Sequence, residues 1–423
     1  MAKQVINNTD ISPDSLKQAF TKANANFTDL YNLADNYMGV QIPTTGSQVL
    51  TRTGNTSWGI SPPFLDDIAL VLLADNLTEN QVLATPLSPQ IPAEADLTGA
   101  SGQVMVRFKK FWYKEYFNGE GDLVEIRWSP VALPGYTLHP FFSDGTNEAD
   151  YAYISAYEAG DDGGTKLKSA SGVAPLTSVA LPTFRDRAVA RGSGWHAYDF
   201  WAQHLIQMYF YLYYASLDSQ GELPGYTKAS AYDAAYKRLT GRSNILTSMN
   251  GSIDAELGEG ETDEDLSAVL SEGSKIANRF LFIENIFGHI WKMLDGVSFD
   301  GRIGENNTVF LSKNPADYSS VEANILADYE NLNINLSGLS GYIGTVHSGF
   351  IPKTIAGNSS SYFGDYLYSN LDDEGRDYLR LVLAGGSLAI GVLAGVAYRH
   401  SVNPLGSSSS YSGSRLCAKK FNV

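Results

Sequence analysis

Residues 381–400 read LVLAGGSLAIGVLAGVAYRH, and no charged side chain lies between Leu381 and Tyr398. A helix that crosses a bilayer needs about 20 consecutive apolar residues, so this uncharged run of 18 residues is slightly short for one. Gly391 and Gly395 have the spacing that is common where membrane helices touch. A membrane anchor is therefore one interpretation of the stretch.

The other interpretation is a soluble strand, loop and strand. LRLVLAG (379–385) is then a short buried strand, GSLAIGVL (386–393) a loop interrupted by glycine, and AGVAYRH (394–400) a second strand. The acidic residues before the stretch and the serine-rich residues after it favour this second interpretation. We expect the tip of the loop to be exposed to water and to a binding target.

The chain around this stretch has 423 residues, which is long for a single hydrophobic core and indicates two or more units. With 43% apolar and 18% charged residues, the composition is that of a globular protein. A net charge of −16 argues against nucleic acids and anionic membranes as partners, because both attract clustered Lys and Arg. The 25 Tyr, 19 Phe and 6 Trp favour a binding protein. One cysteine, Cys417, excludes an intrachain disulfide.

Three segments are predicted. Residues 1–40 contain a helix with Ser12 as its N-cap and Pro13 at its first position. Its apolar stripe either packs within its own domain or meets copies of itself in an oligomer, and consists of Leu16, Phe20, Ala23, Phe27, Leu30 and Leu33. Residues 41–98, rich in Thr, Gly, Pro and Ser, are predicted to be a linker or small adaptor module, and residues 99–423 the main domain. The N-terminus lacks the apolar region of a signal peptide, so synthesis in a cytoplasm is expected.

Within the main domain the pattern changes along the chain. Residues 102–117 and 122–130 alternate like two strands of a hairpin, with the turn at Gly119–Asp122. Residues 194–220 have a helical period and are apolar nearly all round, which predicts a core helix. The acidic residues 251–273 are predicted to be a surface loop.

Sequence motifs for catalysis and metal binding are missing. The six histidines are scattered without an HExxH pattern, and neither a GxSxG motif nor a phosphate-binding loop occurs. Glu115 and Asp144 could in principle serve as paired carboxylates, but nothing singles out this pair and solvated surface charge explains both residues better. We therefore expect no enzymatic activity, no metal and no cofactor.

Several phrases in order carry a resemblance: WSPVALPGYTLHPFF, FRDRAVARGSGWHAYDFWAQHLIQMYFYLYYASLDSQ and GGSLAIGVLAGVAYRHSVNPLGSSSSYSGSRLCAKK. Residues 100–423 resemble the C-type lectin-like fold of phage receptor-binding tail proteins, in particular the targets of diversity-generating retroelements (the major tropism determinant group). Formylglycine-generating enzymes share that fold. LKQAFTKANANFTDLY resembles the N-terminal helix of phage tail fibres and tail spikes. The resemblance implies an α+β, C-type lectin-like domain behind an N-terminal helical attachment segment.

The resemblance also implies a variable region at about residues 380–416, where apolar side chains at exposed positions would form a receptor-binding patch. The predicted receptor-binding residues are Leu388, Ile390, Val392, Leu393, Arg399, His400, Val402, Leu405, Tyr411, Tyr362, Phe363 and Tyr366. Inward packing is the alternative for Val392 and Leu393, and core strands for the aromatic residues. The chain lacks the paired cysteines of the oxidase relatives and the calcium motifs of the lectins.

Together these features predict a phage tail adhesin that binds a host-cell receptor without catalysis. Its expected partners are a protein or glycan receptor, other tail proteins through the N-terminal segment, and two further copies in a homotrimer. Nucleic acid and membrane insertion are not expected, and the predicted location is the virion tail. The alternatives are a tail-spike enzyme that degrades surface polysaccharide and a structural baseplate or adaptor protein.

Overall fold

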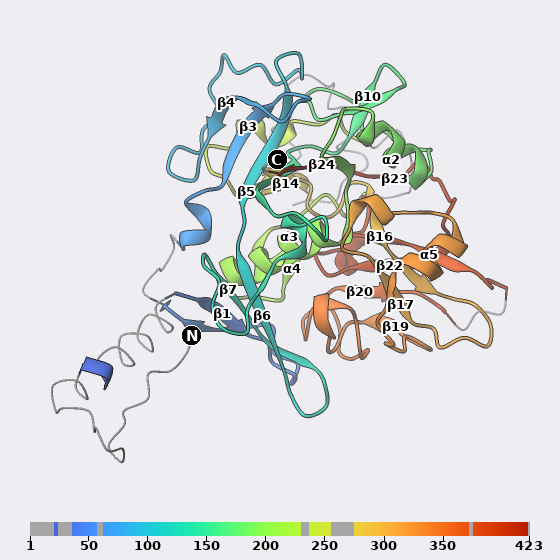
Figure 1. Cartoon of the computed structure of the whole chain (residues 1–423). Helices are drawn as coiled ribbons and strands as arrows, with labels where there is room; N and C mark the ends of the chain where they lie inside the picture. Colours follow the sequence, from blue (N-terminus) through green and yellow to red (C-terminus); the bar gives the residue numbers. More distant parts are fainter. Residues whose placement is uncertain are drawn as a thin grey trace, which may run out of the picture.

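The computed structural model describes residues 21–23, 36–56, 62–229, 237–254, 275–371 and 375–421. About 35% of the structure is strand and about 16% helix, and the strands form several sheets (Figure 1). The predicted α+β, C-type lectin-like architecture is therefore wrong, because the described part of the chain is mostly β. Many of its short apolar runs are rich in β-branched and aromatic residues, which suit strands.

The N-terminal helix was predicted mainly on residues 1–20 and 24–35, which lie outside the described residues. The end of the predicted segment is a strand, because Met38–Gln41 form β1. β1 pairs with β2 (Thr51–Gly54) and with β7 (Leu123–Ser129). Residues 38–41 are therefore already part of a sheet of the main domain.

A six-stranded antiparallel sheet crosses the upper half of the molecule in Figure 1. Its order is β12 (Trp195–Ala197), β24 (Leu416–Phe421), β9 (Ala149–Ser155), β5 (Gln103–Lys109), β3 (Ala69–Leu73) and β4 (Glu79–Ala84). The predicted linker or adaptor at 41–98 is thus not a separate module in its described part, since β3 pairs with β5 and β1 with β7. All five side chains of β3 are buried. Leu70 and Leu72 pack in the main hydrophobic cluster, whereas Ala69, Val71 and Leu73 pack in the cluster that includes Trp291.

A five-stranded sheet contains the hairpin that the sequence predicted. Its order is β2, β1, β7, β6 (Trp112–Phe117) and β8 (Thr137–Leu138). β6 and β7 are antiparallel neighbours, which confirms the predicted turn at Gly119–Asp122. Gly121 has φ +79°, a value that glycine adopts without strain.

An eight-stranded sheet contains both ends of the apolar stretch at residues 381–400. Its order is β18 (Glu330–Asn331), β17 (Val309–Leu311), β16 (Trp291–Asp300), β21 (Leu379–Ala384), β22 (Arg399–Pro404), β20 (Tyr366–Tyr368) and β19 (Ser340–Tyr342), with β23 (Ser412–Gly413) beside β16. β21 and β22 are antiparallel, which confirms the predicted order of strand, loop and strand. The second strand is Arg399–Pro404, however, so the prediction of a strand at 394–398 is wrong. Among the helices of the described residues, none is long and apolar enough to cross a bilayer.

Two small sheets and three short helices complete the described fold. The sheets are β10 (Gly160–Asp162) with β11 (Lys166–Lys168), and β13 (Gly251–Asp254) with β14 (Lys275–Phe280) and β15 (Ile283–Glu284). The helices are α2 (Leu181–Val189), α4 (Ser219–Glu222) and α5 (Glu322–Asp328). Residues 255–273 of the predicted surface loop lie outside the described residues, and the prediction is wrong for 251–254, which form β13.

Helix α3 (Phe200–Tyr214) lies at the centre of the molecule and contacts both β1 and β16 (Figure 1). The Asp199 side chain caps its start by accepting from Ala202 N at 2.7 Å. Every side chain from Phe200 to Leu212 is buried, which confirms the predicted core helix. The helix begins at Phe200 because Trp195–Ala197 already pair as β12.

Charged side chains lie deep in the same core. The Glu158 carboxylate is 2.5 Å from His289 Nδ1 and 3.0 Å from Lys292 Nζ, and all three residues are buried. Four buried arginines donate to several main-chain carbonyl oxygens each: Arg279, Arg380, Arg399 and Arg415. Because an unpaired buried charge is very costly, these contacts hold the surrounding segments in place.

Candidate functional site

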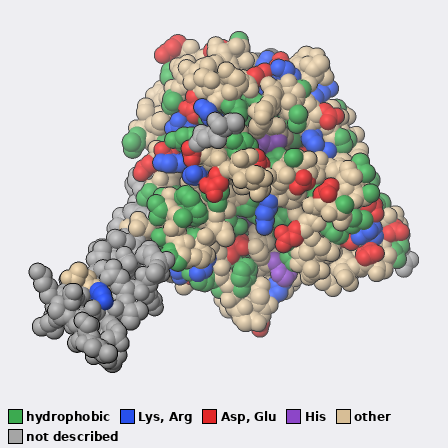
Figure 2. Space-filling view, viewed as in Figure 1, with side chains coloured by type: hydrophobic (Ala, Val, Ile, Leu, Met, Phe, Trp, Pro, Cys, Tyr) green, Lys and Arg blue, Asp and Glu red, His purple; other side chains and the backbone are tan. Residues whose placement is uncertain are grey.

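The predicted receptor-binding residues do not form one exposed patch. Leu388, Phe363, Arg399 and Val402 are buried, so the predicted exposure of these four is wrong. The half-buried members are Ile390, Leu393, His400, Leu405, Tyr411, Tyr362 and Tyr366. Val392 alone among the twelve is exposed, at 56%. On the face shown in Figure 2, hydrophobic side chains occur in scattered groups between acidic and basic ones.

The physical reason is that the predicted residues pack into different parts of the core. Leu388 packs against Tyr226 and Ala229. Leu405 packs against the cluster around α5, whereas Tyr366, Leu393 and Tyr411 pack against the cluster that includes Trp291. Diversification of residues 380–416 stays a prediction, and core packing would restrict the substitutions that such positions tolerate.

The loop between β21 and β22 is held by hydrogen bonds on several sides. Gln220 Nε2 donates to the carbonyl oxygens of Gly391 and Ala394, both at 2.8 Å, and Gln220 Oε1 accepts from Thr227 Oγ1 at 3.1 Å. Gly391 N donates to Thr227 O at 2.7 Å. The loop starts at Gly385, whose φ of +83° favours glycine. Its conformation is therefore set by α4 and the segment after it.

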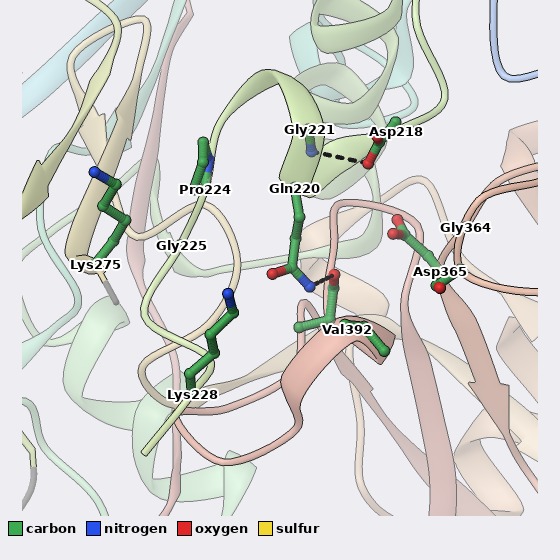
Figure 3. Close-up of a pocket in the computed structure, with 12 residues that line it drawn as sticks. Asp218, Gln220, Gly221, Pro224, Gly225, Lys228, Lys275, Gly364, Asp365 and Val392 are labelled. Atoms are coloured by element: carbon green, nitrogen blue, oxygen red, sulfur yellow. Dashed lines mark hydrogen bonds between the residues drawn. The ribbon is translucent and has the colours of Figure 1, made fainter. Parts of the chain in front are cut away.

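Beside this loop lies a cavity of about 340 Å³, which we call the Val392 pocket (Figure 3). It is lined by Asp218, Gln220, Gly221, Pro224, Gly225, Lys228, Lys275, Ser359, Gly364, Asp365, Val392 and Ala394. The lining comes from four parts of the chain: the α4 region, the start of β14, residues 359–365 and the β21–β22 loop. Its volume lies at the small end of the roughly 300–1,000 Å³ typical of ligand pockets.

Asp365 is the most deeply buried charged group of the pocket, at 2% exposure. Its Oδ2 accepts from Ser219 Oγ at 2.9 Å and from Ala397 N at 2.7 Å. Burial raises the pKa of Asp365 to about 7. Near neutral pH this carboxyl group can therefore either donate or accept a hydrogen bond.

The remaining charges are two lysines and a second aspartate. Lys275 forms an ion pair with Asp254, whereas no ion pair joins exposed Lys228 to another described residue. Asp218 caps α4 by accepting from Gly221 N at 2.8 Å, and Figure 3 shows its carboxylate on the same side of the pocket as that of Asp365. The pocket thus combines the exposed Lys228, hydrogen-bonding carboxyl groups and the apolar Val392.

Sequence reasoning missed Gln220, Lys228 and Asp365. Asp218 carries a usable signal, since Asp is a favoured N-cap, and it draws attention to the short helix that contains Gln220. Lys228 and Asp365 carry no such signal in the sequence, because residues 218–228 and 359–365 become neighbours of the β21–β22 loop only in the folded protein.

The other groups considered from the sequence have structural roles. Asp144 accepts from the main-chain N–H groups of Thr146 and Asn147, and Glu115 accepts from Gly349 N at 2.9 Å. Burial raises the pKa of the Cys417 thiol well above its usual value, which makes it a poor nucleophile. In the described ranges, no three His, Cys, Asp or Glu side chains are grouped so as to hold a metal ion.

The packing of the loop against Asp365 gives a stability test. A Cβ atom at Gly395 would come within 1.9 Å of Asp365 Oδ1. Gly395→Ala is expected to lower the free energy of unfolding by about 1–3 kcal/mol, because Asp365 must move. Gly406→Ala is the control, since nothing lies within 4 Å of its added Cβ atom. Equal urea-unfolding midpoints for the two variants would contradict the described position of Asp365.

No protein-family model and no curated protein matches the chain.

Proposed function

We propose that the protein is a non-enzymatic receptor-binding protein of a phage tail, and that it contacts a host-cell receptor through the Val392 pocket. The observation that carries the proposal is a loop held by Gln220 and Thr227 that leaves Val392 exposed at the edge of a charged pocket. Loops on rigid scaffolds often carry binding residues. A loop that is already ordered loses little conformational entropy on binding.

The location and assembly rest on the N-terminal resemblance to tail fibres and tail spikes. In this proposal the N-terminal segment attaches the protein to the virion tail and three copies assemble. Threefold presentation gives a weak single contact useful avidity, because the second and third contacts form at high effective concentration. The net charge of −16 favours receptors other than nucleic acid.

The chemistry of the pocket suggests what the receptor offers. Lys228 supplies a cation for an anionic group, and Asp365 can exchange hydrogen bonds with hydroxyl groups. Val392 adds a small apolar contact at the edge. An acidic sugar residue of a surface glycan satisfies all three features.

Val392→Asp and Lys228→Glu are expected to lower binding to host cells at least about 10-fold, because they add negative charge beside the site for an anionic group. Val321→Asp is the matched control, since Val321 is 57% exposed, close to the 56% of Val392, and does not line the pocket. The measurement is binding of fluorescently labelled protein to a panel of intact bacterial strains and to their purified surface polysaccharides. Equal binding by Val392→Asp and Val321→Asp would place the receptor contact elsewhere.

The same experiment separates the alternatives. A polysaccharide-degrading enzyme would shorten the purified polysaccharide during incubation, which gel filtration would reveal. A baseplate or adaptor protein would bind no strain in the panel.

A further inference from the structure

A second cavity, of about 410 Å³, lies between the five-stranded sheet, α3 and the edge of the eight-stranded sheet. It shares no lining residue with the Val392 pocket. Its wall includes Tyr113 of β6, Trp201 of α3, and Leu332 and Ile334 after β18. Trp201 Nε1 donates to Ser312 O at 2.9 Å, so its indole N–H is already satisfied. The wall therefore offers mainly aromatic and aliphatic surface.

The polar side of the cavity contains Ser348, and behind it lie Glu115 and a hydrogen-bonded pair of buried histidines. His139 Nδ1 accepts from Phe141 N at 3.2 Å, so a neutral His139 carries its proton on Nε2. Burial lowers the pKa of His139 well below its ordinary value, which keeps the ring neutral. His139 Nε2 then donates to His204 Nδ1 at 2.8 Å, which leaves the proton of a neutral His204 on Nε2.

This tautomer points the Nε2 proton of His204 towards Glu115 without forming a hydrogen bond. His204 Nε2 lies 3.8 Å from Glu115 Oε1, and Gly349 N donates to the same oxygen at 2.9 Å. Glu115 Oε2 accepts from Ser348 Oγ at 2.5 Å. Because the single hydroxyl proton of Ser348 is directed at Glu115, Ser348 Oγ can only accept from a ligand.

We propose that this second cavity binds an uncharged sugar ring. Such a ring has an apolar face that fits the Tyr113, Trp201 and Leu332 wall, and hydroxyl groups that can donate to Ser348 Oγ. The rim also carries Lys313 and Glu330, which lie 3.6 Å apart as an exposed ion pair. Since these charges offset one another, the rim does not select for a charged ligand. The site is independent of Lys228 and of the proposed receptor contact.

The test uses the full chain and the methyl glycosides of glucose, galactose, mannose and N-acetylglucosamine as probes. Saturation-transfer NMR is expected to show saturable binding of at least one glycoside, with a dissociation constant of about 1 mM. Leu332→Trp, which fills the cavity, is expected to abolish the signal. Ser348→Ala is expected to weaken binding about 3- to 10-fold, as for the loss of one hydrogen bond. Leu87→Trp is the control for the added ring, because Leu87 is 93% exposed and lines neither cavity.

The proposal is overturned if none of the four glycosides binds saturably, or if Leu332→Trp binds like Leu87→Trp. Circular dichroism and thermal melting establish that each variant is folded, and Leu332→Phe replaces Leu332→Trp if the larger ring prevents folding. Lys228→Glu must leave glycoside binding unchanged. A failure here would therefore be distinct from a failure of the receptor-binding proposal, which the cell-binding experiment tests.

Discussion

Replacing Glu158 with glutamine is expected to lower the free energy of unfolding by roughly 3–5 kcal/mol at pH 7. The carboxylate lies between His289 and Lys292 in a site where all three residues are buried. Burial and the nearby Arg415 lower the pKa of Lys292 to about 8, so its ammonium is still charged at pH 7. Glu158 raises this pKa, so once the carboxylate is removed Lys292 must either stay charged without an anion or release its proton in the folded state. Urea unfolding followed by tryptophan fluorescence measures the loss.

The stabilisation that Glu158→Gln removes is expected to depend on pH. Burial alone would raise the pKa of Glu158, but His289 and Lys292 outweigh it and lower the pKa from 4.5 to about 2. The stabilisation is therefore complete above about pH 4.5 and lost as the pH falls towards 2. The difference in the free energy of unfolding between wild type and Glu158→Gln should become smaller as the pH falls from 4 to 3. Glu148→Gln, which removes a surface ion pair with Lys110, should cost less than about 1 kcal/mol at either pH.

Arg380→Met is expected to have an effect of similar size, roughly 3–5 kcal/mol. The Arg380 guanidinium is fully buried and donates to the carbonyl oxygens of Ser369, Asn370, Leu371, Arg376 and Ser401. Methionine fills a similar volume but donates no hydrogen bond, so these carbonyl oxygens lose a partner inside the protein.

The control for Arg380→Met is Arg187→Met on α2, which removes a more exposed ion pair with Asp161. That change should cost less than about 1 kcal/mol. Differential scanning calorimetry of both variants against wild type gives the comparison. Similar melting temperatures for the two variants would show that the carbonyl contacts of Arg380 contribute little.

Local periodicity predicted the elements that depend on local sequence. β21 and α3 were each recognisable from their apolar runs, because a continuous apolar pattern indicates an element buried on both faces. Nothing in the local sequence indicated that the strands β1, β2, β3 and β4 belong to the main sheets. Their strand partners lie in β5 and β7, and short runs rich in Thr, Gly and Pro look like a connector until those partners are known.

The candidate site shows the same difference between features that the local sequence indicates and features that depend on distant contacts. Leu388 looks like an exposed binding residue only if the β21–β22 loop projects outward, whereas the hydrogen bonds of Gln220 and Thr227 hold this loop against the body. Asp365 lines a pocket because Gly395, thirty residues later, has no side chain to fill the space. Both outcomes depend on contacts between distant segments, which no local pattern encodes.

The position of β24 has a consequence for synthesis on the ribosome. This strand lies between β12 and β9, and Arg415 just before it donates to Ser155, 260 residues earlier in the chain. During translation, one edge of β9 has no strand partner until the end of β24, residue 421, has left the ribosome. Nascent chains should therefore be prone to association through that open edge, and folding should be slow because it waits for such a remote partner.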